Sequence, residues 1–249
     1  MPETFLLLLC AGVMLASAIP SPREVTLQWL RLCGMIALTM LGLSVFFWTR
    51  RGSFDRIEMV SFGAIAGMVL LQLALVQTAR PVFARLPAIV AAIASFPLAV
   101  RLLGRPVSVP YGAAVVGCAG VGAMCGIVLM EMLLGHAYLT AAKMTIAPFR
   151  RMNFALAAAL ALRIFFGLCG VLMEQRWPVE LFWTRSGLLI GTRWLVGLLV
   201  PAVFVYMTHD CIKRRSTQSA TGILYVAGVL VFIGEMIALY LTRETGLPF

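Results

Sequence analysis

The chain has 249 residues, of which 61% are hydrophobic and only 12% are charged, and its formal net charge is +10. A water-soluble domain carries about 25% charged residues, so this composition excludes one of this length. The mean hydropathy of +0.98 leaves no room for a large domain outside a membrane. The basic residues punctuate the apolar runs as membrane-flanking residues do, so we expect no nucleic-acid partner.

Eight apolar stretches, each close to the roughly 20 residues that cross a bilayer as a helix, fill nearly all of the chain. Backbone groups in lipid must be hydrogen-bonded within their own segment, so helices are expected throughout. The sequence therefore predicts an all-α, polytopic integral membrane protein, a single transmembrane domain over 1–249 with about eight helices in one bundle. The predicted helices cover about 4–20, 26–48, 58–78, 82–103, 110–139, 152–173, 187–208 and 219–242.

The first apolar stretch resembles a secretion signal, because its core is followed by Ala16-Ser17-Ala18. Glu3 stands where such a signal has basic residues. We therefore expect a retained first helix.

Glycine pairs four residues apart recur in the predicted helices, at Gly63/Gly67, Gly122/Gly126 and Gly187/Gly191. Such pairs let two membrane helices approach closely. They favour close packing inside the bundle as much as a special dimer face.

An even number of crossings places both ends of the chain on one side of the membrane, here named side A. Side B then holds the connections at 21–25, 79–81, 140–151 and 209–218. By position, side A receives eight Lys and Arg residues and side B nine. The rule that basic residues stay in the cytoplasm does not decide between eight and nine. The denser clusters after the fifth and seventh helices favour side B as cytoplasmic.

The two histidines, His136 and His209, fall near the side B ends of the fifth and seventh helices. One hypothesis is that both imidazoles ligate the iron of a single b-type haem. A second is that they bind a quinone headgroup and exchange protons with it. A third is that both are interfacial histidines satisfied by water or lipid headgroups. The six cysteines form no CxxC pair, so no iron–sulfur cluster is expected in this chain.

Three polar residues stand near this pair of histidines. Glu131 precedes His136 by about a turn and a half, and ionisable groups at lipid depth usually face a bundle interior. Tyr138 lies near the same face, where tyrosine is also typical of an aromatic belt. Gln218 begins the eighth helix, where it either caps the helix or donates to a carbonyl-bearing ligand.

Three further charged residues, Arg163, Arg193 and Glu235, fall inside predicted helices. A charge at this depth is costly unless it is paired. Glu131 or Glu235 is expected to neutralise Arg163, and Arg193 is placed to pair with Glu235. These groups are either structural ion pairs or a proton path through Glu235, Arg163 and Glu131.

The last third of the chain resembles the quinol-binding membrane-anchor subunits of the dimethyl-sulfoxide-reductase and polysulfide-reductase type. The resemblance rests on Arg193-Trp194 and on Gly234-Glu235-Met-Ile-Ala-Leu-Tyr240, and it covers roughly residues 190–245. It implies an eight-helix bundle that binds quinol without haem and passes electrons to a peripheral iron–sulfur subunit. It also implies that Arg193 and Glu235 belong to a quinone pocket or a proton path. The two histidines have no counterpart in it.

These features predict a membrane-embedded subunit of a multi-subunit respiratory oxidoreductase, in a bacterial cytoplasmic membrane. It would anchor partner subunits and exchange electrons and protons with quinone, with one b-type haem as an open possibility. The chain has no water-exposed catalytic motif, so any enzymatic role belongs to the complex. The alternatives are a small-solute or proton-coupled transporter and a structural or assembly subunit without its own chemistry.

Overall fold

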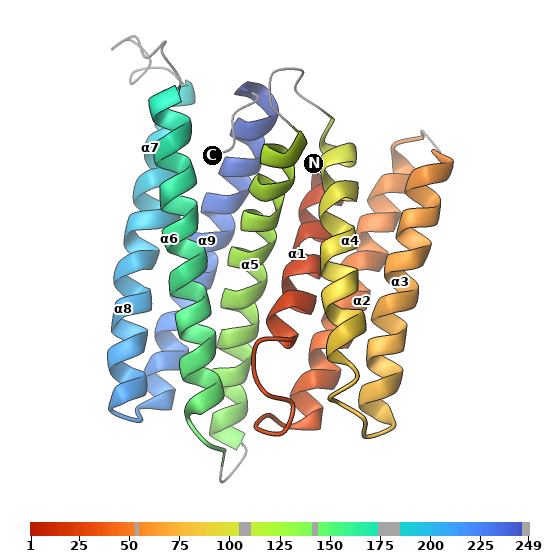
Figure 1. Cartoon of the computed structure of the whole chain (residues 1–249). Coiled ribbons are helices and arrows are strands. Elements are labelled where there is room, and N and C mark those ends of the chain that lie inside the picture. The colour runs from red at the N-terminus through yellow and green to blue at the C-terminus, as the bar shows by residue number, and fades with distance from the viewer. Residues whose placement is uncertain (53–54, 105–110, 141–143, 174–184, 246–249) are drawn as a thin grey trace.

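The computed structural model describes the chain except for residues 53–54, 105–110, 141–143, 174–184 and 246–249. The described part is helical throughout apart from short connections (Figure 1). Its helices are α1 (Pro2–Ser17), α2 (Leu27–Arg50), α3 (Arg56–Gln77), α4 (Arg85–Leu103), α5 (Tyr111–Thr140), α6 (Ala147–Met173), α7 (Arg185–Trp194), a π-helical turn η2 (Leu195–Leu199), α8 (Val200–Lys213) and α9 (Thr217–Thr245).

All eight predicted helices are present, because α7, η2 and α8 continue one another as a single crossing. Seven crossings in the described residues are long and apolar enough to span a membrane, and α1 is a shorter apolar helix of 16 residues. The all-α membrane architecture is therefore confirmed. One boundary differs clearly: α6 begins at Ala147 instead of 152. Pro148 falls in its first turn, where the missing N–H of proline costs nothing.

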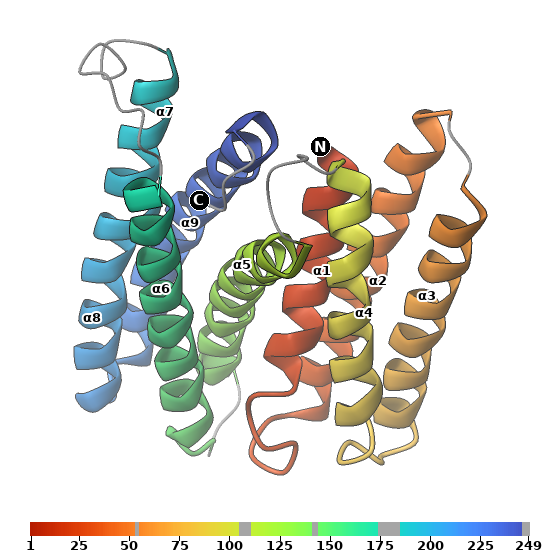
Figure 2. The same ribbon diagram turned by 45° about the horizontal axis from the view of Figure 1, so that its top comes forward.

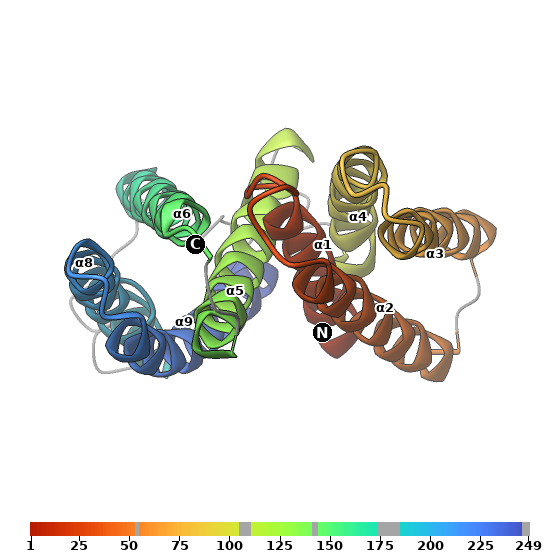
Figure 3. The same ribbon diagram turned by 90° about the horizontal axis from the view of Figure 1, so that it is seen from below.

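The helices alternate in direction, so α1 begins and α9 ends on side A, the upper side in Figure 1. Within the bundle they form two neighbouring groups of four, seen from side B in Figure 3. In one group, α1, α2, α3 and α4 pack in a ring, with α4 returning to α1. In the other, α5, α6, α8 and α9 do the same, with α9 returning to α5. The tilted view in Figure 2 shows α5 between the two groups.

Helices α1 and α5 join the two groups through glycine. A Cβ on Gly12 would lie 1.8 Å from the carbonyl oxygen of Gly122, and one on Gly126 would lie 2.0 Å from the carbonyl carbon of Gly12. The backbones therefore touch where they cross, as small residues allow in membranes. Close packing is confirmed for Gly122/Gly126. A Cβ on Gly63 or Gly67 would meet no described atom within 4 Å, so that pair packs no helix here.

We predict that Gly12→Ala destabilises the protein, because its methyl group must push α1 away from α5. Overpacking of this kind costs about 1–3 kcal/mol. The matched control is Gly67→Ala, in which the methyl group enters open space. Thermal unfolding in detergent should show a lower Tm for Gly12→Ala and an unchanged or higher Tm for the control. An equal effect of both substitutions would contradict the close crossing.

Candidate functional site

Three buried charges meet inside the second group of helices. Arg163 comes from α6, Arg193 from the end of α7, and Glu235 from α9. Their exposed fractions are 2%, 1% and 0%. Arg163 donates from Nε to Oε1 of Glu235 at 3.2 Å and from Nη2 to Oε2 at 2.6 Å. The bidentate pair is the strong geometry for an arginine and a carboxylate. Both predicted partners of Glu235 are therefore present.

The second arginine is held less completely than the first. Nη2 of Arg193 lies 3.0 Å from Oε1 of Glu235. Nevertheless, none of its three guanidinium nitrogens completes a hydrogen bond with a described residue, because the angle at that contact is poor. Two cations share one carboxylate, so the cluster carries a net charge of +1 when all three groups are ionised. A desolvated excess charge of this kind is costly, so the cluster depends on Glu235.

The backbone around Arg193 is shaped to admit its side chain. A Cβ on Gly197 or on Gly234 would lie 3.1 Å from Nη1 of Arg193, and the two glycine Cα atoms face each other. Gly197 lies in η2, just before Pro201. A π-helical turn adds a residue to the helix, and such turns are frequent at functional sites. The close approach of η2 to α9 thus brings the guanidinium to Glu235.

Glu131 does not join the cluster. Cys125 marks the level of the cluster on α5, because it interacts electrostatically with all three charged groups. Glu131 lies six residues further along α5 toward side B, about 9 Å at the rise of an α-helix. It is fully buried, and neither of its carboxyl oxygens has a hydrogen-bond partner in the described residues. Among the expected partners of Arg163, the structure therefore selects Glu235.

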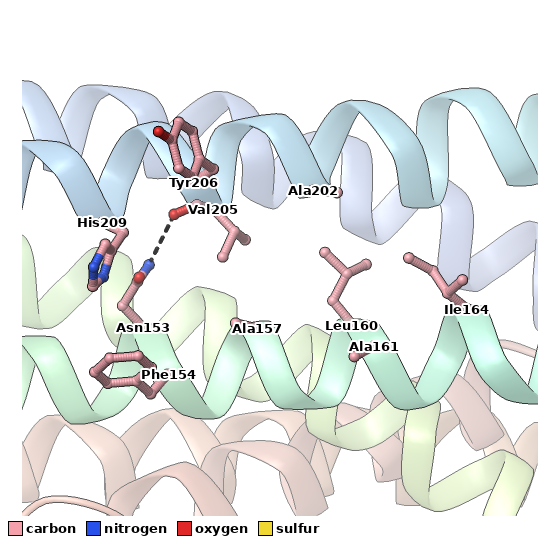
Figure 4. Close-up of a pocket in the computed structure, with 10 residues that line it drawn as sticks. All are labelled: Asn153, Phe154, Ala157, Leu160, Ala161, Ile164, Ala202, Val205, Tyr206 and His209. Atoms are coloured by element: carbon pink, nitrogen blue, oxygen red, sulfur yellow. Dashed lines mark hydrogen bonds between the residues drawn. The ribbon is translucent and has the colours of Figure 1, made fainter.

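Asn153 on α6 is the polar neighbour of Glu131. Its amide interacts with the Glu131 carboxyl, although the geometry of the pair completes no hydrogen bond. The amide instead donates from Nδ2 to the Val205 carbonyl at 3.5 Å, a long contact (Figure 4). Asn153 is 2% exposed. Asn153 therefore borders both the Glu131 carboxyl and the space between α6 and α8.

That space is a cavity of about 360 Å³ between α6 and α8. Figure 4 shows Asn153 and His209 at one end and Ala202, Leu160 and Ile164 toward the other. It runs along α6 from Asn153 to Ile164, about 16 Å of helix. The walls are almost entirely apolar, and the polar groups gather at the side B end. The lining residues are Asn153, Phe154, Ala157, Leu160, Ala161, Ile164, Ala202, Val205, Tyr206 and His209.

His209 marks the polar end of this cavity. It lies four residues before the end of α8, and its ring is 5.3 Å from that of Phe154 at an angle of 59°. Tyr206, one turn earlier, is 74% exposed. The imidazole is therefore held beside the cavity by an aromatic neighbour while it stays near the side B surface.

His136 faces a different cavity. It lies four residues before the end of α5, so it shares side B with His209, as an even number of crossings requires. The cavity that it lines is about 340 Å³ and lies between α5 and α2. Its walls are Thr26, Gln28, Trp29, Leu32, Leu133, His136 and Ala137. The two histidines thus share a membrane side and not a cavity.

The remaining predicted site residues lie outside both cavities. The Tyr138 hydroxyl donates to the Thr145 carbonyl, and its ring stacks on Phe149 with centroids 5.4 Å apart. Gln218 is exposed in the first turn of α9. The hydroxyl of Tyr138 therefore ties the end of α5 to Thr145, which stands two residues before α6 begins.

Sequence reasoning missed two residues that the structure brings forward, Asn153 and Trp29. Asn153 is the only asparagine in the chain, which was a usable signal within a predicted helix. Trp29 carries no such signal, because tryptophan near a membrane surface is ordinary.

Comparisons of the chain with protein-family models, curated proteins and solved structures return no match.

We predict that Glu235→Gln is far more destabilising than Arg193→Met. Glu235→Gln leaves two buried guanidinium groups without a carboxylate, a loss of about 3–5 kcal/mol. Arg193→Met leaves the neutral bidentate pair of Arg163 and Glu235 intact. Thermal unfolding of the purified variants measures the order, and an equal loss of Tm in both would contradict the shared-carboxylate arrangement.

Proposed function

We propose that this integral membrane protein is the quinone-exchanging subunit of a redox complex, and that the quinone headgroup binds at the polar end of the cavity between α6 and α8. The observation that carries the proposal is the combination of an apolar track with Asn153 and His209 at one end and the buried Glu131 behind them. Cofactor cavities in proteins have this mixture of apolar walls and a few polar groups.

The cavity suits a ligand that reaches it through lipid. Its volume of about 360 Å³ accommodates an aromatic headgroup and the start of an isoprenoid tail. The apolar track continues from the headgroup end toward Ile164, deeper in the membrane. The Asn153 amide and the His209 imidazole both supply hydrogen bonds of the kind that a quinone carbonyl accepts.

The reaction requires a source of protons as well as electrons. Reduction of a quinone to a quinol takes two electrons and two protons. We assign one proton to the His209 imidazole, because histidine commonly serves as a general acid, a general base or a proton shuttle. We assign the other to the Glu131 carboxyl, on which a proton removes the cost of burying a bare charge. Quinol oxidation returns both protons to the same groups.

The electrons enter or leave through a partner subunit. The resemblance of residues 190–245 to anchor subunits of the polysulfide-reductase type supports a peripheral iron–sulfur partner. In that proposal the chain lies in a bacterial cytoplasmic membrane. The cluster of Arg163, Arg193 and Glu235 then has a positioning role, because it ties together α6, α7 and α9 next to the cavity.

A haem held by both histidines does not fit this geometry. Bis-histidine ligation requires His136 and His209 to face one cavity, and they line separate ones. The proposal is therefore confined to quinone.

A proton-coupled transporter is the second candidate, favoured by one observation. The two groups of four helices run in the same order and direction, as do the parallel repeats of some transporters. Proteoliposomes that contain only this chain and no quinone separate the two candidates. Proton uptake driven by an imposed membrane potential would support the transporter, and the quinone proposal expects none.

We predict that Ala202→Phe lowers the amount of quinone that the purified complex retains by at least about tenfold. The added ring occupies the cavity, and a steric cost of 1.4 kcal/mol already corresponds to a factor of ten. Val203→Phe is the matched control, because Val203 is 57% exposed on the adjacent position and lines no part of the cavity. Solvent extraction and chromatography measure the quinone. Equal retention in both variants would rule out this cavity.

We predict that Glu131→Gln lowers quinol-linked turnover by about a hundredfold, the usual loss when a general acid is removed. Quinone retention should stay normal, because the substitution keeps the shape of the side chain and Glu131 does not line the cavity. Turnover is measured in membranes that contain the complex with its partners. Normal turnover in Glu131→Gln would remove this carboxyl from the proton transfer while leaving the cavity assignment to the retention experiment.

A further inference from the structure

The cavity between α2 and α5 is not used by the proposed function. It opens at the side B end of both helices and holds about 340 Å³. Its walls are as polar as they are apolar, unlike those of the cavity between α6 and α8. No acidic residue is among the residues that line it.

The groups around this cavity are predominantly donors. Trp29 is 2% exposed, and its Nε1–H has no acceptor in the described part of the chain. A buried donor without a partner is rare in folded proteins and calls for an acceptor. The hydroxyl of Thr26 accepts from the backbone N–H of Trp29, so its own hydrogen remains to be donated. The Gln28 amide and the exposed His136 imidazole complete the set.

The start of α2 supplies further hydrogen-bond donors to this cavity. Thr26 is the N-cap of this 24-residue helix. The N–H groups of the first turn, at Leu27 and Gln28, have no acceptor within the helix, and they carry the positive end of the helix dipole. Helix starts of this kind bind anions, phosphate above all. Here the helix start is joined by a cavity, a histidine from another helix and an unpartnered buried indole.

The surrounding charges favour an anion as well. Glu24 is the acidic residue nearest in sequence, and Arg151 at the start of α6 pairs with it. Arg23 and Arg31 flank the segment and are exposed. These three arginines and one glutamate carry a net charge of +2, and an excess of positive charge draws anions toward this end of the bundle.

We propose that the cavity between α2 and α5 binds a phosphate-bearing anion, held by the Trp29 indole N–H, the Thr26 hydroxyl, the first-turn amides of α2 and His136. The phosphate belongs to an anionic lipid headgroup or to free phosphate. This site is separate from the quinone cavity, and its existence does not depend on the proposed function.

The test is titration of the purified full-length protein in detergent with phosphatidylglycerol or with inorganic phosphate, followed by native mass spectrometry. Trp29→Phe keeps an aromatic ring but removes the N–H donor, and His136→Gln changes an exposed side chain without disturbing the core. Each should weaken binding by about tenfold, as expected for loss of a hydrogen bond to a charged group. His209→Gln is the matched control on the same side of the membrane and should bind like the unaltered protein.

The outcomes separate the two sources of phosphate. Binding of phosphatidylglycerol alone supports a lipid headgroup, and binding of inorganic phosphate as well supports recognition of the phosphate group itself. The proposal is overturned if neither probe binds the unaltered protein, or if Trp29→Phe and His136→Gln bind as tightly as His209→Gln. Because quinone retention is a separate measurement, failure here leaves the quinone cavity standing.

Discussion

Glu235 is the residue on which the second group of helices depends. Its carboxylate receives Arg163 from α6 and Arg193 from α7, at a depth where neither cation has water to solvate it. The surrounding lipid strengthens this constraint, because an unpaired charge at that depth has a high free-energy cost and no water to lower it. One side chain on α9 therefore fixes the position of two other helices. Gly197 and Gly234 have no side chains, and this lets the backbones of η2 and α9 come close together.

The cavity between α6 and α8 follows from that constraint. At the side A end of the cavity, the ion pair of Arg163 and Glu235 holds α6 to α9. Toward side B, small residues such as Ala157 and Ala202 leave space between α6 and α8. The space ends at Asn153, with Glu131 buried behind it. A buried charged cluster next to an apolar track is a suitable arrangement for positioning a membrane-dissolved ligand.

The helices and the ion pairs were predictable from sequence for one physical reason, which is that lipid solvates neither backbone groups nor charges. That reason gives eight apolar helices and a buried carboxylate for each arginine, with Glu235 expected for Arg193 and either Glu131 or Glu235 for Arg163. The parity of the crossings likewise places both histidines on side B. The rotation of each helix about its own axis could not be predicted in this way, because the lipid-facing and protein-facing sides of these helices are equally apolar. Hence nothing in the sequence shows that His136 faces α2 while His209 faces α6. Gly63 and Gly67 illustrate the same difficulty, since their spacing suits packing but they contact no helix here.

Photolabelling with an azidoquinone tests the central claim most directly, because it reports where a quinone lies without requiring the partner subunits. The protein is illuminated with the label and digested, and the modified peptides are identified by mass spectrometry. The structure predicts labels on 153–164 of α6 and on 202–209 of α8, reduced by an excess of unlabelled quinone. Labels confined to α2, α3 and α4, or insensitive to competing quinone, would contradict the assignment of this cavity.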